Sequence, residues 1–156
     1  MILESVKELI LSLDSNAKFK DGKDNRLWVT LESDKLKIVL KSLKDKGYNY
    51  ISTISGLDQI QNGKIVLLYH IMNDSPREYP YITIRIELPR EDPKVSSIHD
   101  ILPGALLHEN EVFDMFGVNF VGHPNLGRLL LPENVRDDIH PLRRDFKDNV
   151  YEGIRK

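Results

Sequence analysis

A strictly alternating strand constrains the fold of this chain more than any other feature. From residue 81 to residue 88, large aliphatic side chains occupy every second position, at Ile82, Ile84, Ile86 and Leu88. A period of two puts these side chains on one face of a β-sheet and the intervening polar and aromatic residues on the other. The chain therefore contains a sheet with one buried face.

Two more strands, 48–55 and 64–72, precede this one, and the short connections between the three predict an antiparallel meander. Residues 27–31 predict a further strand after a polar connection at 14–25. Helical spacing predicts helices over 2–13, over 36–43 with Ser33 as cap, and over a segment that ends at Phe116. This order predicts an α+β fold: a mainly antiparallel sheet with helices packed on one face, followed by an extended C-terminal arm.

Length and composition limit the functional classes. The 156 residues suit one domain, and 40% apolar with 29% charged residues is typical of a globular protein. A formal net charge of -2 disfavours general binding to nucleic acid. No apolar run approaches the roughly 20 residues of a membrane span, and no signal-peptide pattern opens the chain, so an intracellular location is expected. The absence of cysteine removes disulfides, thiolate nucleophiles and ordinary iron–sulfur ligation.

The helix that ends at Phe116 carries the most informative side chains. Gly117 predicts a left-handed cap after it. Helical spacing puts Glu109 on the apolar stripe and Glu111 and Asp114 on the polar face. A buried carboxylate requires a partner. We expect Glu109 to pair with an arginine of the tail, either Arg128 or one of Arg143 and Arg144.

A catalytic interpretation of the same helix is a stand-alone hydrolase that uses Glu109, Glu111 and His108 as an acid–base set. No nucleophile or phosphate loop accompanies these residues, and the polar face explains Glu111 as a solvated side chain. Val112 stands where a zinc motif beginning at His108 would need a second histidine, so no metal site is predicted.

The tail that follows the helix is polar and interrupted by prolines. As a surface tail its arginines would only be solvated, whereas as an interface they match the enrichment of arginine and aromatic residues at contact centres. We expect residues 123–146 to be loosely held until a partner orders them, because such a composition supports no compact core.

Three segments of this region carry an ordered set of motif residues. These are Glu109, Glu111, Phe113, Asp114, Met115, Phe116 and Gly117 in the first segment, Gly122, His123, Pro124, Leu126, Arg128 and Leu130 in the second, and His140, Pro141, Leu142, Arg143, Arg144, Asp145 and Phe146 in the third. Together the segments resemble the signature of a known family: the thirty-kilodalton subunit of respiratory complex I and its relatives in membrane-bound nickel–iron hydrogenases and formate hydrogenlyases. Asn110, Gly127 and Leu107 depart from the family pattern.

The resemblance implies an accessory, cofactor-free subunit in the peripheral arm of an ion- or proton-translocating redox complex, on the cytoplasmic face of the membrane. Its partners would be a large subunit related to the nickel–iron hydrogenase catalytic subunit, a small iron–sulfur subunit, and through them a membrane module. Iron–sulfur clusters, and a nickel–iron centre or a quinone, would belong to those partners. Residues 1–117 would form the α+β domain, and 118–156 an arm that packs on partner subunits. The departures and the short chain favour the hydrogenase-type branch over the complex I branch.

Overall fold

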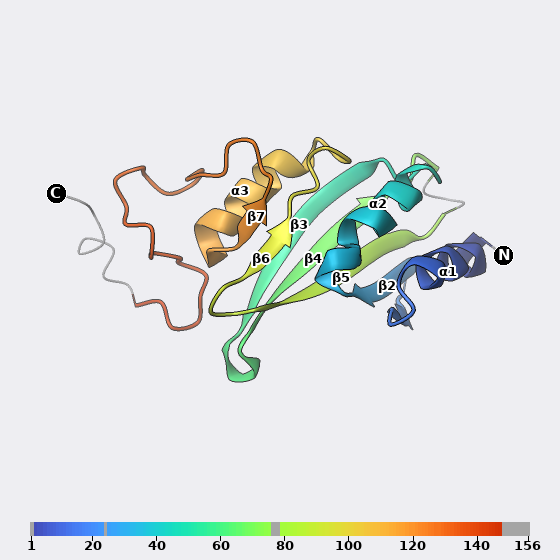
Figure 1. Ribbon diagram of the computed structural model, residues 1–156, viewed down its shortest axis with the longest axis horizontal. Coiled ribbons are helices and arrows are strands. Elements are labelled where there is room, and N and C mark those ends of the chain that lie inside the picture. The colour runs from blue at the N-terminus through green and yellow to red at the C-terminus, as the bar shows by residue number, and fades with distance from the viewer. Residues whose placement is uncertain (1, 24, 76–78, 148–156) are drawn as a thin grey trace.

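A five-stranded sheet with helices on one face forms most of the molecule (Figure 1). The computed structural model describes residues 2–23, 25–75 and 79–147. The elements are α1 (Ile2–Leu13), β1 (Lys18–Asp21), β2 (Arg26–Leu31), the 3-10 turn η1 (Ser33–Lys35), α2 (Leu36–Lys44), β3 (Tyr50–Gln59), the 3-10 turn η2 (Ile60–Asn62), β4 (Lys64–Met72), β5 (Tyr81–Pro89), β6 (Lys94–Ser96), α3 (Ala105–Phe116) and β7 (Asn119–Val121).

The large sheet has the strand order β1-β2-β5-β4-β3. The meander of β3, β4 and β5 is antiparallel, as predicted, and β1 pairs antiparallel with β2. The pairing of β2 with β5 is parallel, with Val29 opposite Ile84. The connection between these two strands contains α2, β3 and β4, which gives the chain the length that a parallel crossover requires. The predicted α+β class is confirmed.

The core lies between one sheet face and the helices. It contains the alternating residues of β5 together with Leu27, Val29, Ile65, Leu67 and Tyr69 from neighbouring strands. The i, i+3, i+4, i+7 stripe of α2 supplies its helical side, and Leu36, Val39, Leu40 and Leu43 are all at most 1% exposed. Burying apolar area at roughly 25 cal/mol per Å² makes this layer the main source of stability.

A second, two-stranded sheet positions α3. β6 and β7 pair in parallel, with Val95 opposite Phe120, and α3 is the crossover between them. The ring of Phe116 lies against β3 at Gly56, where an added Cβ would come within 2.5 Å of the ring. Glycine at position 56 therefore allows α3 to pack closely on the sheet.

Three short strands were not predicted. β1 lies within the polar segment that was expected to be only a connection, and its side chains are mostly exposed. β6 and β7 have three residues each, too few for a period to show in the sequence, although Phe120 in β7 is 1% exposed and belongs to the core. Residues 128–131 form neither a strand nor a helix.

Candidate functional site

The end of helix α3 and the chain after β7 form the candidate site. We call residues 122–147 the C-terminal segment; residues 148–156 of the predicted arm lie outside the described residues. Figure 1 shows this segment extending from α3 at the end of the molecule away from the N-terminus. The segment contains most of the family-motif residues, and its contacts with α3 determine how they are presented.

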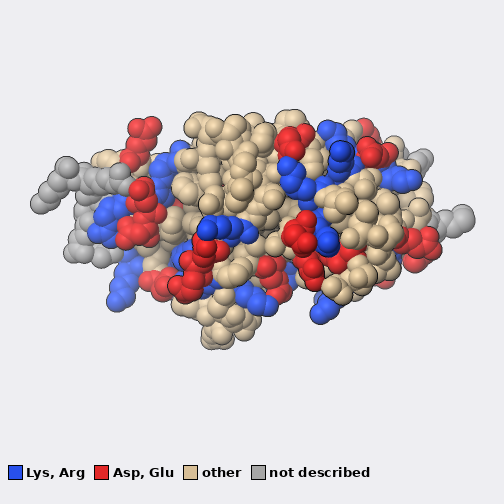
Figure 2. Space-filling view, in the orientation of Figure 1, with Lys and Arg blue, Asp and Glu red and all other residues tan. Residues whose placement is uncertain are grey.

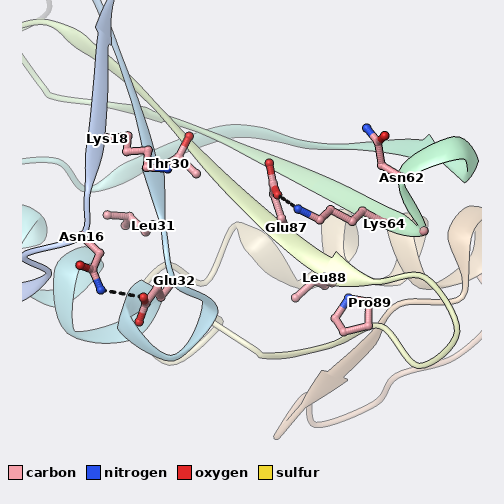
Figure 3. A pocket seen from close by; sticks show the side chains of 11 residues that line it. Asn16, Lys18, Thr30, Leu31, Glu32, Asn62, Lys64, Glu87, Leu88 and Pro89 are labelled. Carbon is pink, nitrogen blue, oxygen red and sulfur yellow. Dashed lines mark hydrogen bonds and ion pairs between the residues drawn. The ribbon is translucent and has the colours of Figure 1, made fainter.

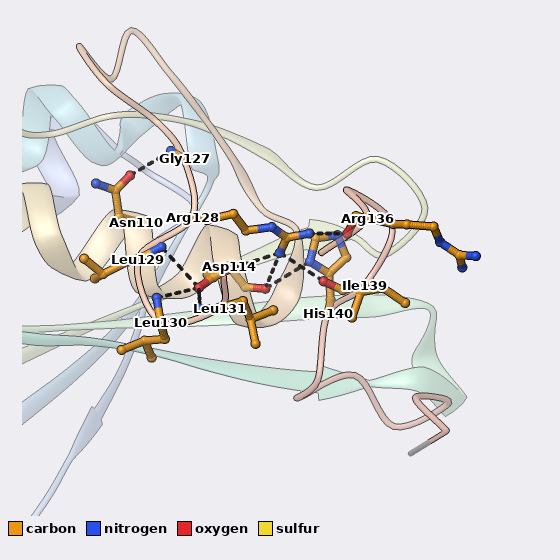
Figure 4. Close-up of polar contacts among 10 residues, drawn as sticks. All are labelled: Asn110, Asp114, Gly127, Arg128, Leu129, Leu130, Leu131, Arg136, Ile139 and His140. Carbon is orange, nitrogen blue, oxygen red and sulfur yellow. Dashed lines mark hydrogen bonds and ion pairs between the residues drawn. The ribbon is translucent and has the colours of Figure 1, made fainter. Parts of the chain in front are cut away.

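Asp114 is the centre of the best-connected polar cluster (Figure 4). Its side chain is completely buried, and Oδ1 accepts a hydrogen bond of 2.8 Å from Nη1 of Arg128. Its Oδ2 accepts the backbone N–H groups of Leu129, Leu130 and Leu131 at 3.2, 2.8 and 2.8 Å. The expectation that Asp114 faces solvent is therefore wrong, because the loop 128–131 folds over the polar side of α3 and supplies a complete set of donors.

These donors keep the Asp114 carboxyl ionised. Burial alone would raise the pKa of this carboxyl, but the hydrogen bonds from Leu131, Arg128, Leu130 and Leu129 outweigh burial and the pKa is lowered. The guanidinium of Arg128 also donates to the carbonyl oxygens of Ile139, at 3.0 Å, and Arg136. Arg128 thus connects two turns of the C-terminal segment to the same carboxylate.

Glu109 is fully buried, as predicted, but its predicted arginine partner is wrong. Its Oε1 accepts the backbone N–H of Ile98 at 2.8 Å, and its Oε2 accepts the hydroxyl of Ser97. Within the described residues, no arginine contacts it. The reason is geometric: Arg128 is committed to Asp114, and the guanidinium of Arg143 donates to the backbone of Phe116 at 2.7 Å.

The predicted motif at 140–146 closes the C-terminal end of α3. The last four carbonyl groups of a helix have no partners inside it. Here Gly117 N–H donates to Phe113 O at 2.8 Å, His140 Nδ1 to Asp114 O at 3.1 Å, Leu142 N–H to Met115 O at 3.1 Å, and Arg143 Nε to Phe116 O. Every orphan carbonyl is satisfied, so the first and third motif segments form one structural unit.

Gly117 makes this closure possible. It has φ of 74°, in the left-handed region, and a Cβ at this position would lie 2.5 Å from Nε2 of His140. Burial lowers the pKa of the His140 imidazole, which keeps the ring neutral at pH 7 with the Nδ1 proton directed at the Asp114 carbonyl. Pro141, which follows, is half-buried.

A second ion pair holds the far end of the segment, and the sequence analysis missed it. Arg90 donates through Nε and Nη2 to the two carboxylate oxygens of Asp58, at 2.7 and 2.9 Å, and also pairs with Asp145 at 2.6 Å. The backbone N–H of Arg144 donates to Asp58 at 2.7 Å. The Arg90 guanidinium holds the pKa of Asp58 below its usual range. Asp58 is buried near the C-terminal end of β3. The sequence feature that could have indicated this ion pair is the charged residue that interrupts the apolar pattern there.

Other family-motif side chains remain exposed. Glu111, Pro124, Arg144 and Asp145 are open to solvent, Arg143 and Phe146 are partly buried, and Leu142 is 54% exposed. Large apolar side chains are also exposed nearby, at Leu107, Val121, Leu129 and Leu130. Figure 2 shows an uncharged area over α3 and β7, bordered by mixed acidic and basic side chains. Exposed apolar area rimmed by charge is typical of a protein interaction surface.

The hydrolase interpretation finds no support in this geometry. No hydrogen bond or ion pair joins any two of His108, Glu109 and Glu111, all of which the structure describes, and Glu109 is inaccessible while Glu111 is exposed. In the described part of the chain there is no group of three or more His, Asp or Glu side chains arranged to hold a metal ion.

A large open hollow lies away from these residues. It has a volume of about 1020 Å³ and lies between β1, β2 and the turn before β4. Figure 3 shows that two of its polar pairs are already engaged with each other, Asn16 with Glu32 and Lys64 with Glu87. This hollow brings together none of the predicted site residues.

Sequence comparison identifies the family. The family model described as "Respiratory-chain NADH dehydrogenase, 30 Kd subunit" matches residues 29–152. This chain belongs to that family. The chain is 33% identical to an NADH-quinone oxidoreductase subunit of Moorella thermoacetica over 120 residues, covering 76% of this chain and 78% of the relative. It is 31% identical to NADH-quinone oxidoreductase subunit 5 of Thermus thermophilus over 161 residues, covering 94% and 72%.

A solved structure extends the family likeness to nearly the whole fold. A chain in the structure of "the membrane-bound sulfane sulfur reductase (MBS), an archaeal respiratory membrane complex" is similar with a TM-score of 0.79 and 25% identity, over 96% of this chain and 88% of that one. The resemblance inferred from the three motif segments is therefore confirmed. Within the described residues of this member of the 30 kDa subunit family, no helix is long and apolar enough to cross a membrane.

Proposed function

We propose that this chain is an accessory subunit of a membrane-associated redox complex and has no catalytic centre of its own. The observation that carries the proposal is the family match over residues 29–152, which includes all three motif segments. The relatives' names are those of NADH-quinone oxidoreductase subunits, and the similar structure is a respiratory membrane complex. The chain would act by binding other subunits rather than by transforming a substrate.

The proposed partners follow from the family. The main one is a large subunit related to the nickel–iron hydrogenase catalytic subunit, with a small iron–sulfur subunit nearby and a membrane module attached through the complex. Iron–sulfur clusters, and a quinone or a nickel–iron centre, would be held by these partners, on the cytoplasmic face of the membrane. The absence of cysteine from the 156 residues supports a subunit that holds no cluster itself.

The proposed contact surface combines the exposed motif residues with the exposed aliphatic residues around them. The first group includes Glu111, Pro124 and Arg144, beside the partly buried Phe146, and the second includes Leu129, Leu130 and Leu142. Arginine and aromatic side chains at the centre of an interface supply most of its binding free energy, and the contacts around them exclude water. Hydrogen bonds to α3 already fix the conformation of the C-terminal segment, so the segment would present this surface with little entropic cost of ordering on binding.

The test is purification of the tagged full-length protein from its native membrane. We expect the large subunit and the iron–sulfur subunit to be recovered with it, and metal analysis of the complex would distinguish a nickel-containing enzyme from a quinone-reducing one. Leu130→Gln, at a 60% exposed position in the segment, should reduce that recovery about tenfold or more.

Leu11→Gln is the matched control, because Leu11 is 44% exposed on α1, at the other end of the molecule. This variant should leave recovery of the partners unchanged. Recovery of the protein as a lone chain, or equal recovery of partners with both variants, would contradict the proposed interface.

A further inference from the structure

The second buried carboxylate of α3, that of Glu109, has no arginine or lysine beside it in the part of the chain that the structure describes. Glu109 is 0% exposed, and in the described residues neither an arginine nor a lysine forms an ion pair with it. Its nearest basic group is the imidazole of His123, whose Nε2 is 3.9 Å from Oε2. The comparison with Asp114 is direct, because that carboxylate, five residues further along the helix, has an arginine and three backbone donors.

The hydrogen bonds of His123 show that its ring is uncharged. The backbone N–H of Asn125 donates to Nδ1 at 3.1 Å, so Nδ1 carries no proton. The proton is then on Nε2, which lies 3.1 Å from the carbonyl oxygen of Leu106 and donates to it. His123 therefore gives Glu109 no full positive charge, although it is almost completely buried against it.

A hydrogen-bonded chain connects Glu109 to a more exposed side chain. The hydroxyl of Ser97 is 2.5 Å from Oε2 of Glu109, and the same oxygen is 3.0 Å from Nδ1 of His99. Ser97 is buried, whereas His99 is only partly buried. The sequence of groups from the surface inward is thus imidazole, hydroxyl, carboxyl.

One further buried group lies close to this carboxyl. Tyr69, on β4, is fully buried, and its hydroxyl has no hydrogen-bond partner among the described residues. Burial raises the pKa of this hydroxyl, and the negative charge of Glu109 raises it further, which places the phenol within the field of the carboxylate. The titratable groups acting on Glu109 are therefore His99 from the turn after β6, His123 from the C-terminal segment and Tyr69 from the sheet.

We propose that Glu109 is a proton-binding site that exchanges its proton with solvent through Ser97 and His99. When His99 is doubly protonated and Glu109 ionised, Nδ1–H donates to Ser97 Oγ, and the Ser97 hydroxyl donates to Oε2. Transfer moves the Nδ1 proton to Ser97 and the Ser97 proton to Glu109. The result is a neutral carboxylic acid and a neutral imidazole, and every hydrogen bond in the chain is reversed. His99 keeps its proton on Nε2 in this state, so the ring becomes doubly protonated again only when Nδ1 takes up a new proton.

Two physical effects favour occupation of this site. A buried carboxylate without a cation is costly, so burial raises the pKa of Glu109, and the hydrogen bonds from Ile98 and Ser97 only partly oppose the shift. The chain Glu109–Ser97–His99 also supports both protonation states without moving any heavy atom, because Ser97 can donate in either direction. The proton-binding site belongs to this polypeptide itself and does not depend on the proposed subunit role.

The experiment is a pH titration by NMR of the full-length, ¹³C-labelled chain. It follows the carboxyl carbon of Glu109 and the ring carbon of His99. We expect Glu109 to titrate above the ordinary Glu value of about 4.3, and His99 to show a second inflection at the same pH. Ser97→Ala should leave the Glu109 titration in place and remove that second inflection.

Glu109→Gln preserves the shape of the side chain and should give His99 a single titration, which tests the coupling even if Ser97→Ala does not fold. Glu111→Gln, at an exposed position of the same helix, should change neither curve. The proposal is overturned if Glu109 titrates at or below the ordinary value, if it shows no titration between about pH 4 and 9, or if the His99 curve is the same in wild type and Glu109→Gln.

Discussion

The sheet body, residues 2–121, and the C-terminal segment are held by different forces. The body has a continuous apolar core of strand and helix side chains, whereas in the described part of the segment Val135 is the only buried apolar residue. The segment is instead held by hydrogen bonds and ion pairs at Asp114, at the last carbonyls of α3 and at Arg90. Apolar burial is insensitive to pH and to single charges, whereas these contacts depend on particular donors and acceptors.

The difference shows how a polar chain remains ordered on a small domain. The sequence analysis expected residues 123–146 to be loosely held without a partner, on the ground that they support no compact core. In the structure, turns and hydrogen bonds arrange residues 122–147 around a helix end instead of around a core. Polar networks of this kind are strong when complete and fail when one member is removed. The following predictions use that contrast.

The largest expected effect is that of Asp114→Asn. The amide cannot accept from Arg128 and three backbone N–H groups as the carboxylate does, and removing one partner of a buried ion pair costs about 3–5 kcal/mol. We expect hydrogen exchange at residues 129–131 to become much faster and the melting temperature to fall. Glu111→Gln is the control on the exposed side of the helix. Unchanged exchange in Asp114→Asn would mean that the segment is held without this carboxylate.

A variant in the core should destabilise the sheet body and leave the C-terminal segment unaffected, the opposite of Asp114→Asn. Leu40→Ala deletes a side chain that is 1% exposed in α2, and such deletions cost about 2–5 kcal/mol. The free energy of global unfolding should fall by this amount, measured by denaturant titration. The backbone amides of residues 129–131 should still exchange through local opening of the segment, at the rate seen in the wild type. The reason is that, among the described residues, α2 makes no hydrogen bond to the segment. Selective loss of protection in the segment would contradict the separation of the two regions.

Acid should loosen the segment before the body. The pKa values of Asp58 and Asp114 are lowered in the folded chain, so the stability they contribute is present above the ordinary Asp value of about 4 and is lost as pH falls through the lowered values. Resonances of residues 128–146 should change first below about pH 4, while the amides of β4 and β5 remain protected. Simultaneous loss of both regions would refute this order.

The smallest effect on stability is expected for Arg144→Ala. Its side chain is exposed, and its backbone N–H, which bonds to Asp58, is kept in the variant, so the free energy of unfolding should change by no more than about 0.5 kcal/mol. If the exposed side chain belongs to the partner interface, assembly with the large subunit should still weaken by about 1–2 kcal/mol. A binding assay alongside a thermal melt measures both. Lys41→Ala, an exposed change on α2, should alter neither.

Local patterns in the sequence determined the regular elements of the body. Helix α1 was predicted with its observed bounds, the four residues of the predicted apolar stripe of α2 are all buried, and α3 ends at Phe116 with Gly117 in the left-handed conformation. The alternation in β5 identified its buried face correctly. These features depend on neighbours a few residues apart, and their periodicity is therefore visible in the sequence.

Tertiary structure alone decided the features that depend on distant residues. The exposed strand β1 has no apolar pattern and exists because β2 offers it an edge, and the parallel pairing of β2 with β5 follows from the path of the chain between them. The helical wheel assigned the two buried carboxylates of α3 by position only, and their partners come from distant parts of the chain. Arg128 reaches Asp114 across 14 residues, whereas Glu109 meets Ser97 and His123. A wheel records the side of a helix on which a residue lies; the donor that reaches it depends on how the whole chain folds back.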